Sequence, residues 1–314
     1  MLEAIVACAL AGAQDSTALR INDGATPAAT VPAGAALAEG APPILGVAER
    51  TRVTADVGAW VARLTGTTSV GAAGTSFNLN EDLAVEDQTV GAAGEFAVWC
   101  DRWRFGGVGL IIGLNETQTA PKAGVYGTTA IAIGDTIRGD YNLWMAGAEV
   151  GYVVWRPFAD EPWPWSAPSA NRELATKAMG HNGRPLFDLR LLVLAGGLGM
   201  GYDQTLQNVS TGSSSEFSTT VGAIYGGGGA EFDLGMDDRI PVLQDIRIYA
   251  YAGLGPTIPD GDAVWMVRVG LAAMVTPNIG VEFGYRLFDF NLTDGPSEVD
   301  GGVRGIFGAV AVKF

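Results

Sequence analysis

The stretch Ile279–Phe288 reads IGVEFGYRLF and alternates bulky apolar residues with glycine or charge. A period of two residues is the signature of a β-strand whose two faces meet different surroundings. Ile279 and Phe283 belong to one face of this strand, whereas Glu282 and Arg286 belong to the other. The stretch therefore predicts a strand with one apolar and one charged face.

The amino-acid composition indicates the surroundings of that apolar face. Hydrophobic residues make up 48% of the 314 residues and charged residues only 17%, whereas a soluble domain carries about 25% charge. The longest apolar runs, 4–13 and 191–201, fall short of the roughly 18 residues that a membrane helix needs. A closed β-barrel faces lipid without such a helix, because its strands satisfy each other's backbone groups. The sequence therefore predicts an all-β fold, a closed antiparallel transmembrane barrel.

The same alternation recurs along residues 51–314 and predicts about ten strands, with eight or twelve as alternatives. The predicted strands are 52–65, 89–101, 103–117, 138–156, 187–204, 215–233, 244–256, 263–276, 278–292 and 303–314. An even strand number brings the C-terminus back to the side of the membrane on which the first strand began.

The connections between these strands predict an orientation. With the N-terminus in the periplasm, the short turns near 101–102 and 276–278 are periplasmic, as is typical of outer-membrane barrels. The external loops are then 66–88, 118–137, 205–214, 257–262 and 293–302. The 157–186 connection breaks the pattern, since it is long yet periplasmic. Its residues Ser169–Met179 predict a short helix that ends at Gly180.

Residues 1–13 and 14–50 precede the predicted barrel. The apolar run 4–13 ends in Ala11-Gly12-Ala13, which is typical of a signal peptide or a remnant of one. Lipidation at Cys8 and a coincidental apolar start are the alternatives. Residues 14–50 are rich in Ala, Pro, Gly and Thr and predict a flexible segment.

Strand parity also assigns charged residues to the lumen, because a lipid-facing Arg or Lys near the bilayer midplane costs about 2–4 kcal/mol. The assigned residues are Asp56, Glu95, Arg104, Glu149, Arg190, Glu231, Arg247, Arg268, Glu282 and Arg286. These are five acids and five bases, although the net charge of the chain is −15. We expect them to form a charge-balanced network that fills a narrow lumen.

Three of the predicted strands, 103–117, 187–204 and 215–233, are less regular. Val108 and Leu110 share the face of Arg104, and Leu192 and Leu194 share the face of Arg190. Either a bulge changes the parity within these strands, or aliphatic side chains fill part of the lumen.

The last nine residues, Ile306–Phe314, read IFGAVAVKF and place apolar residues at alternate positions before a terminal aromatic. This ending resembles the C-terminal insertion signal of Gram-negative outer-membrane β-barrel proteins. The resemblance implies that Val310, Val312 and Phe314 are read by the barrel-assembly machinery. It implies a bacterial outer-membrane location and contact with lipid and lipopolysaccharide, and it carries over no catalytic or ligand-binding residue.

No pattern in the sequence favours catalysis, a metal or a cofactor. The single histidine, His181, lies in the 157–186 connection without an Asp or Ser nearby, so a polar turn residue is the better interpretation. The glycines at 197–201 and 226–229 precede no helix, which a phosphate-binding loop requires. The carboxylates in 78–87 and 294–300 are typical of solvated loops, with a weak divalent-cation site as the alternative.

The sequence thus predicts a non-enzymatic outer-membrane barrel of structural, adhesive or narrow-pore type. The alternatives are an outer-membrane lipase or protease and an exported soluble β-sandwich. Nucleic acid is excluded as a partner, because the excess of negative charge would repel phosphates. The external loops and the 157–186 segment are the candidate surfaces for a protein partner.

Overall fold

The computed structural model describes residues 51–83, 85, 88–157, 187–236, 243–258 and 262–314, and every regular element in these ranges is a strand. The elements are β1 (Thr51–Ser69), β2 (Phe77–Asn78), β3 (Thr89–Cys100), β4 (Trp103–Thr119), β5 (Gly124–Tyr126), β6 (Thr129–Ile131), β7 (Thr136–Trp155), β8 (Phe187–Asn208), β9 (Ser213–Gly235), β10 (Asp245–Ile258), β11 (Ala263–Met274), β12 (Ile279–Asp294) and β13 (Ser297–Lys313).

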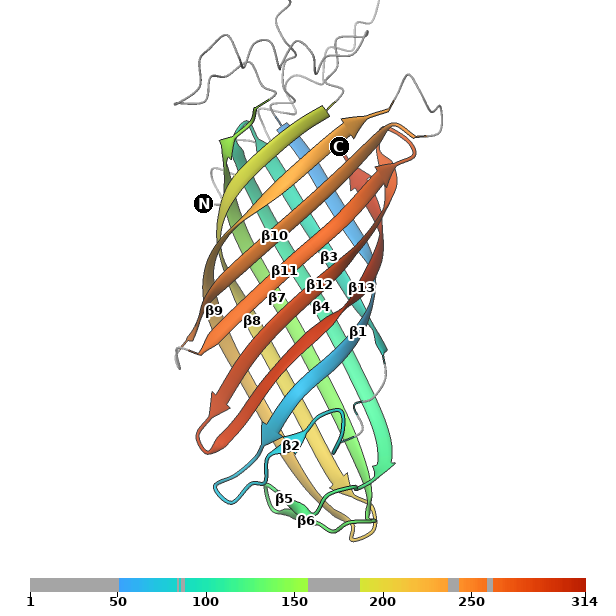
Figure 1. Cartoon of the computed structure of the whole chain (residues 1–314), viewed down its shortest axis with the longest axis vertical. Coiled ribbons are helices and arrows are strands. Elements are labelled where there is room, and N and C mark those ends of the chain that lie inside the picture. Colours follow the sequence, from blue (N-terminus) through green and yellow to red (C-terminus); the bar gives the residue numbers. More distant parts are fainter. Residues whose placement is uncertain (1–50, 84, 86–87, 158–186, 237–242, 259–261) are drawn as a thin grey trace, which may run out of the picture.

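Ten of these strands form one closed antiparallel barrel (Figure 1). Each long strand pairs with the next one along the chain, and β13 pairs with β1 to close the sheet. The short β2 pairs with Thr67 and Thr68 near the C-terminal end of β1, and β5 and β6 form a separate two-stranded sheet. The predicted fold class and strand number are therefore confirmed, and closure leaves no unpaired edge for lipid to meet.

The two ends of the barrel differ (Figure 1). Residue 51 and Phe314 lie at the same end, which we call the termini end; the turns 101–102 and 275–278 also belong to it. The opposite end, here the loop end, carries β2, β5 and β6. Phe77, Leu79 and Leu83 from its loops are fully buried, and the Tyr141 hydroxyl, from inside the barrel, donates a hydrogen bond to the Leu83 carbonyl. The loops thus fold inward over the barrel mouth.

Two predicted loops at the loop end are wrong. Residues 205–214 and 293–302 lie mostly in strands, because β8 and β9 continue to a turn at 209–212, and β12 and β13 continue to a turn at 295–296. Gly212 and Gly295 occupy positive φ values of 77° and 57° in these turns, a conformation that glycine adopts at little cost. The polar character of these segments reflects strands that extend beyond the lipid-facing region.

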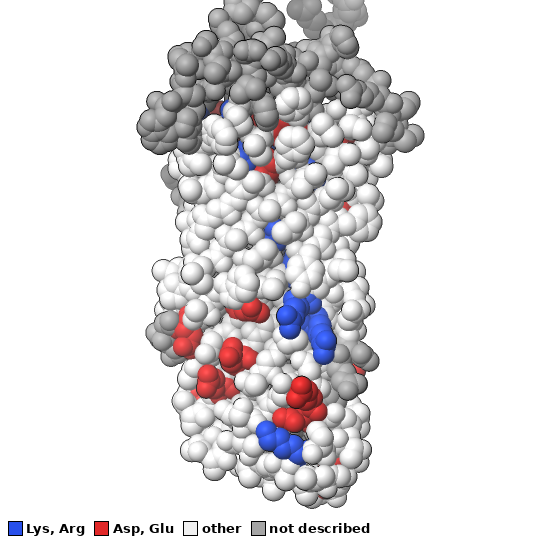
Figure 2. Space-filling model, viewed as in Figure 1, with Lys and Arg blue, Asp and Glu red and all other residues white. Residues whose placement is uncertain are grey.

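The outer surface carries an apolar belt. Its exposed residues include Val57, Ile111, Leu254 and Ile306, each more than 60% exposed. On β7, Tyr152 and Trp144 lie eight residues apart on the outer face, which is about 27 Å along a strand. Among the described strand residues, charged side chains that point outward lie towards the loop end beyond this belt, and Figure 2 shows them gathered on the lower part of one face.

Some predictions concern residues outside the described ranges. The signal peptide at 1–13, the flexible segment at 14–50, and the helix and His181 within 157–186 fall there, so they stay predictions. In the described part of the chain, no helix is long and apolar enough to cross a membrane.

Candidate functional site: the barrel lumen

Within the part of the chain that the structure describes, charged side chains are buried together in the lumen. Strand alternation points every second residue of each strand inward, and the strong curvature of a ten-stranded sheet brings side chains from opposite walls into contact. Seven of the ten residues assigned to the lumen are less than 9% exposed, namely Asp56, Arg104, Glu149, Glu231, Arg268, Glu282 and Arg286. The side chains of Glu95, Arg190 and Arg247 are 9%, 15% and 16% exposed.

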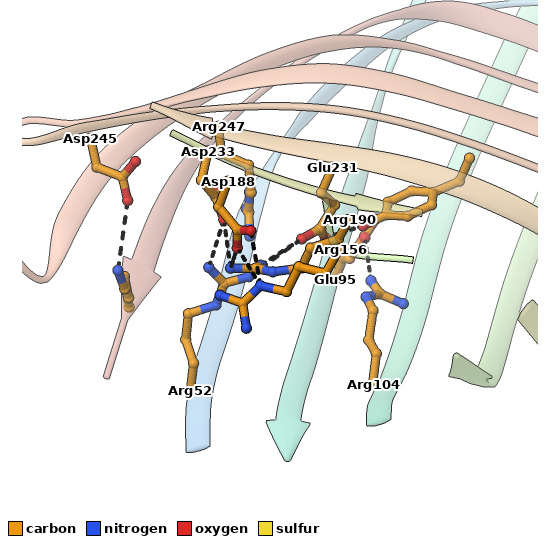
Figure 3. A network of polar contacts seen from close by, with 12 residues as sticks. Arg52, Glu95, Arg104, Arg156, Asp188, Arg190, Glu231, Asp233, Asp245 and Arg247 are labelled. Carbon is orange, nitrogen blue, oxygen red and sulfur yellow. Dashed lines mark hydrogen bonds and ion pairs between the residues drawn. The ribbon is translucent and has the colours of Figure 1, made fainter. Parts of the chain in front are cut away.

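A first cluster of ion pairs lies near the termini end (Figure 3). Arg190 reaches Asp188 at 2.8 Å, Asp233 at 3.0 Å and Glu231 at 3.2 Å. Arg52 reaches Glu231 at 3.4 Å and Asp233 at 3.3 Å from the opposite wall. Arg52 thus joins β1 across the lumen to β9, a strand that is not its neighbour in the sheet, and Arg190 of β8 joins the same carboxylates.

A second cluster is centred on Glu149 of β7. Its carboxylate accepts hydrogen bonds from Arg104 on β4, from Arg268 on β11 at 2.7–2.8 Å, and from the Tyr225 hydroxyl on β9 at 3.0 Å. Four strands therefore converge on one buried carboxylate. Charge-assisted hydrogen bonds of this kind are the strong ones, and they offset the cost of burying the charges.

The second cluster continues through Glu95 of β3. Its carboxylate lies 3.2 Å from Arg268, 3.2 Å from Arg286 and 3.4 Å from Arg104. Arg286 in turn lies 3.6 Å from Asp56, and its guanidinium lies 4.0 Å from the centre of the Phe307 ring. No hydrogen bond reaches the guanidinium of Arg286, so opposite charge and the aromatic ring hold it.

Glu282 of β12 completes the set of charged residues. It pairs with Arg247 at 3.3 Å and accepts a hydrogen bond from the Tyr249 hydroxyl. All ten residues assigned to the lumen by parity thus have a partner of opposite charge.

Apolar side chains fill much of the lumen beside and beyond the charged clusters, together with a few buried polar residues such as Gln204 and Asn208. Val108, Leu110, Leu192 and Leu194 are at most 9% exposed, so they point inward with the arginines of their own strands. Aliphatic filling, not a bulge, explains the irregular parity of β4 and β8; the one register shift between β7 and β8 lies at Val153/Trp155. The inward apolar side chains of the lumen include Trp60, Leu64, Leu110, Ile112, Leu143, Met145, Leu198, Met200, Met266, Phe288, Phe290 and Phe307.

A cavity lined by Asp56, Glu95, Arg104, Tyr251 and Glu282, among others, measures about 10 Å³. This is room for about one water molecule.

Metal-binding groups do not come together in the described residues, where no three His, Cys, Asp or Glu side chains are placed to hold an ion. In the acidic loop 78–87, Asp82 accepts a hydrogen bond from the Asn78 backbone at 2.8 Å and lies 3.5 Å from Lys122. The glycines at 197, 199 and 226–229 lie inside β8 and β9, as expected for strand glycines.

Several residues of the lumen were missed by the sequence analysis. Arg52, Asp188 and Asp233 pair in the first cluster, and Arg156 lies 2.9 Å from Asp188. Tyr225, Tyr249 and Tyr251 donate hydrogen bonds to the buried glutamates. The parity that assigned the ten charges also places Arg52, Asp233 and the tyrosines inside. The lipid penalty applies to charges at mid-strand, so it gives no signal for residues at strand ends or for neutral hydrogen-bond donors.

The predicted insertion signal lies on the outer face of β13. Val310 and Phe314 are 55% and 74% exposed, and Val312 is half-buried. Phe314 exchanges two backbone hydrogen bonds with Val53 of β1, at 2.8 and 3.1 Å. Phe314 therefore lies in the β1–β13 strand pair that closes the barrel, here called the closing seam, and its ring is exposed.

The comparisons with known proteins were made by sequence and by structure. No family model and no curated protein matches the sequence. Similar solved structures include the outer membrane protease OmpT from Escherichia coli, at 10% identity and a TM-score of 0.42, covering 84% of this chain and 97% of that one. Ail, the attachment invasion locus protein of Yersinia pestis, gives 11% identity and a TM-score of 0.33, covering 84% and 99%. Neisserial surface protein A gives 12% and 0.29, covering 84% and 97%.

The architecture of this chain and the distribution of its polar side chains are enough to classify the fold. Ten antiparallel strands close on themselves, an apolar belt covers the outside, and the charged side chains of the belt region are buried inside. Only a protein that spans a lipid bilayer with strands needs this inversion of polarity. The chain therefore has the architecture of a β-barrel that spans a lipid bilayer with ten antiparallel strands.

Proposed function

We propose that this protein is a closed, non-enzymatic outer-membrane barrel of structural or adhesive type, which acts through its loop-end surface and not through a pore. The observation that carries the proposal is the filled lumen. Ion pairs cross it near the termini end, and buried apolar side chains fill it towards the loop end.

The two layers oppose conduction for different reasons. In the charged layer, every mobile ion would have to displace an arginine or a carboxylate that already has a partner, which costs several kcal/mol per pair. In the apolar layer, a passing ion would lose its water and meet few polar groups to replace it. Since Phe77, Leu79 and Leu83 also cap the apolar layer, a narrow pore is the less favoured member of the predicted class.

The loop end supports an adhesive or structural role. The β8–β9 hairpin reaches beyond the apolar belt and ends in the sequence NVSTGSSS, 208–215. Its hydroxyl groups are exposed or half-buried at the tip, for example at Ser210, Thr211 and Ser214. With the termini end in the periplasm, this polar surface faces the outside of the cell, where an adhesive protein meets its partner.

Single-channel recording in planar bilayers tests the proposal. The refolded protein is expected to give no steady conductance, while a general porin prepared in the same way serves as the positive control. A large steady conductance from the unmodified protein would refute closure. Flat activity assays with lipid and peptide substrates are expected; turnover of either would contradict the non-enzymatic role.

The expected partners follow from the same proposal. The outward apolar belt contacts membrane lipid, and the barrel-assembly machinery is proposed to read Val310, Val312 and Phe314. A protein partner would bind at the external loops or at the 157–186 segment, which lies outside the described residues.

A further inference from the structure

Two arginines face each other on the outside of the barrel. Arg63 of β1 and Arg304 of β13 are direct cross-strand partners in the pair of strands that closes the sheet, and both are exposed. Like charges directly opposite each other destabilise a sheet. Since the two residues are 241 positions apart in the chain, only closure of the barrel brings them together.

Nothing in the described part of the chain neutralises this pair. No carboxylate of the described residues lies within 4.0 Å of either guanidinium group. Arg304 donates a hydrogen bond of 3.4 Å to the Thr65 hydroxyl. The outward carboxylate of Asp289 lies beside Gly302, the next outward position of β13, and forms no ion pair with Arg304. The pair therefore presents two positive charges and a hydroxyl to the surroundings.

The position of the pair indicates what those surroundings are. One outward step towards the termini end, Val61 pairs with Ile306; these side chains are 38% and 65% exposed and belong to the apolar belt. Arg63 and Arg304 are thus the first charged residues beyond the belt on these two strands. On the face drawn in Figure 2, blue Lys or Arg side chains lie just below a largely uncharged band. Lipid head groups occupy this border between hydrocarbon and water.

We propose that Arg63 and Arg304, with the Thr65 hydroxyl, form a binding site for the phosphate of a phosphorylated glycolipid in the leaflet that surrounds the loop end. Arginine suits this role because its planar guanidinium binds phosphate through paired hydrogen bonds and is weakly hydrated. One phosphate between the two groups would turn an unfavourable pair of like charges into a favourable one. The proposal rests on the proposed orientation, in which the loop end faces outward.

Heat-modifiability on gels provides the test. The full chain is refolded into phosphatidylcholine vesicles that contain either diphosphoryl lipid A or the same lipid A without its phosphates. The temperature at which half of the folded band is lost is then measured. For the unmodified protein, this midpoint is expected to be several degrees higher with the phosphorylated lipid. The double variant R63Q/R304Q is expected to lose that increment.

The sign of the effect in the absence of phosphate separates binding from a structural role. In vesicles with phosphate-free lipid A, R63Q is expected to match or exceed the midpoint of the unmodified protein, because the like-charge repulsion is gone. A lower midpoint there would mean that the arginines support the fold itself, and it would contradict the proposal.

A matched control removes a different arginine. Arg138 is exposed on the outer face of β7 and lies 3.6 Å from Asp140, so R138Q is expected to keep the full lipid-dependent increment. Retention of the increment by R63Q/R304Q, or its loss in R138Q, would overturn the assignment. An equal increment from inorganic phosphate in phosphate-free vesicles would overturn the lipid source. If the unmodified protein conducts but keeps the lipid-dependent increment, only the proposed closure is refuted. If it does not conduct and shows no lipid-dependent increment, only this binding site is refuted.

Discussion

Glu149 shows at the scale of a single residue how the lumen is held together. Its carboxylate receives hydrogen bonds from Arg104, Arg268 and Tyr225, and its exposed fraction is 6%. Removing a partner from such a group leaves buried charges without compensation, which costs about 3–5 kcal/mol. An exposed pair of the same chemistry contributes about 0–1 kcal/mol, because water already solvates both charges.

We therefore expect Glu149→Ala and Arg268→Ala each to lower the free energy of unfolding by about 3–5 kcal/mol. Asp140→Ala, which removes the exposed partner of Arg138, should cost at most about 1 kcal/mol. Urea titration of the refolded barrel in detergent, followed by intrinsic fluorescence, measures all three. Equal costs for Glu149→Ala and Asp140→Ala would show that the lumen is hydrated like the surface.

Glycine has a specific role at the closing seam. A Cβ atom at Gly305 would overlap the Val61 carbonyl oxygen of the neighbouring strand, whereas one at Gly222 would meet nothing closer than 3.9 Å. Gly305→Ala must therefore shift the backbone between β1 and β13, and we expect a cost of about 1–3 kcal/mol, as for other overpacked sites. Gly222→Ala should stay within about 0.5 kcal/mol of the unmodified protein. The same urea titration compares them, and identical midpoints would disprove the close approach.

At the scale of elements, β13 combines two tasks. It pairs with β1 to close the barrel, and it displays Val310 and Phe314 outward. The backbone bonds between Phe314 and Val53 do not depend on the Phe314 side chain, and its exposed ring adds little packing inside the protein. A substitution of Phe314 should therefore affect assembly in the cell without much effect on the stability of the folded barrel.

We predict that Phe314→Asp blocks assembly in the outer membrane but leaves the refolded protein nearly as stable as the unmodified one. Cell fractionation with heat-modifiability measures assembly, and refolding in detergent measures stability. Normal amounts of folded Phe314→Asp protein in the outer membrane would contradict the proposed insertion signal.

The loop that joins β4 to β7 is tied to the β8–β9 hairpin by Asp135. Its carboxylate accepts hydrogen bonds from the Ala132 backbone at 2.8 Å and from the Asn208 amide at 2.7 Å. The Ala132 N–H first, and the Asn208 amide second, hold the pKa of Asp135 below its usual value of 3.8. A lowered pKa in the folded state means that the stabilisation is complete above pH 3.8 and is lost as the pH falls through the lowered value.

Hydrogen exchange at the Ala132 amide is expected to report this titration. Asp135→Ala should exchange faster than the unmodified protein at pH 6, and the ratio of the two rates should approach one only in acid, below about pH 4. A ratio that is already near one at pH 6 would show that Asp135 does not hold the loop.

At the scale of the whole molecule, closure rests on two layers with different physics. The charged layer depends on pairs such as Glu149 with Arg268, and the apolar layer on side chains such as Phe77 and Leu79. We predict that Glu149→Ala/Arg268→Ala alone and Phe77→Ala/Leu79→Ala alone both remain without steady conductance, and that the combined variant shows small openings. Planar bilayers are the measurement. Large openings from either double variant would mean that one layer closes the barrel by itself.

The sequence by itself determined the fold class, predicted about ten strands, and assigned a face to each mid-strand charge. It could do so because lipid enforces the period of two; an outward charge within the belt is too costly, so Glu282 and Arg286 reveal the inner face of their strand without any knowledge of their neighbours. The same rule failed to classify Leu110 and Leu194, because an apolar side chain satisfies both lipid and a packed lumen.

Only the tertiary structure decided which groups meet. The partners of Glu149 come from β4, β9 and β11, and the opposition of Arg63 to Arg304 depends on closure between the first and last strands. Alternation assigns a face but contains no information about contacts across the lumen. Those contacts depend on barrel curvature and on the register of every strand pair, and these are properties of the closed sheet as a whole.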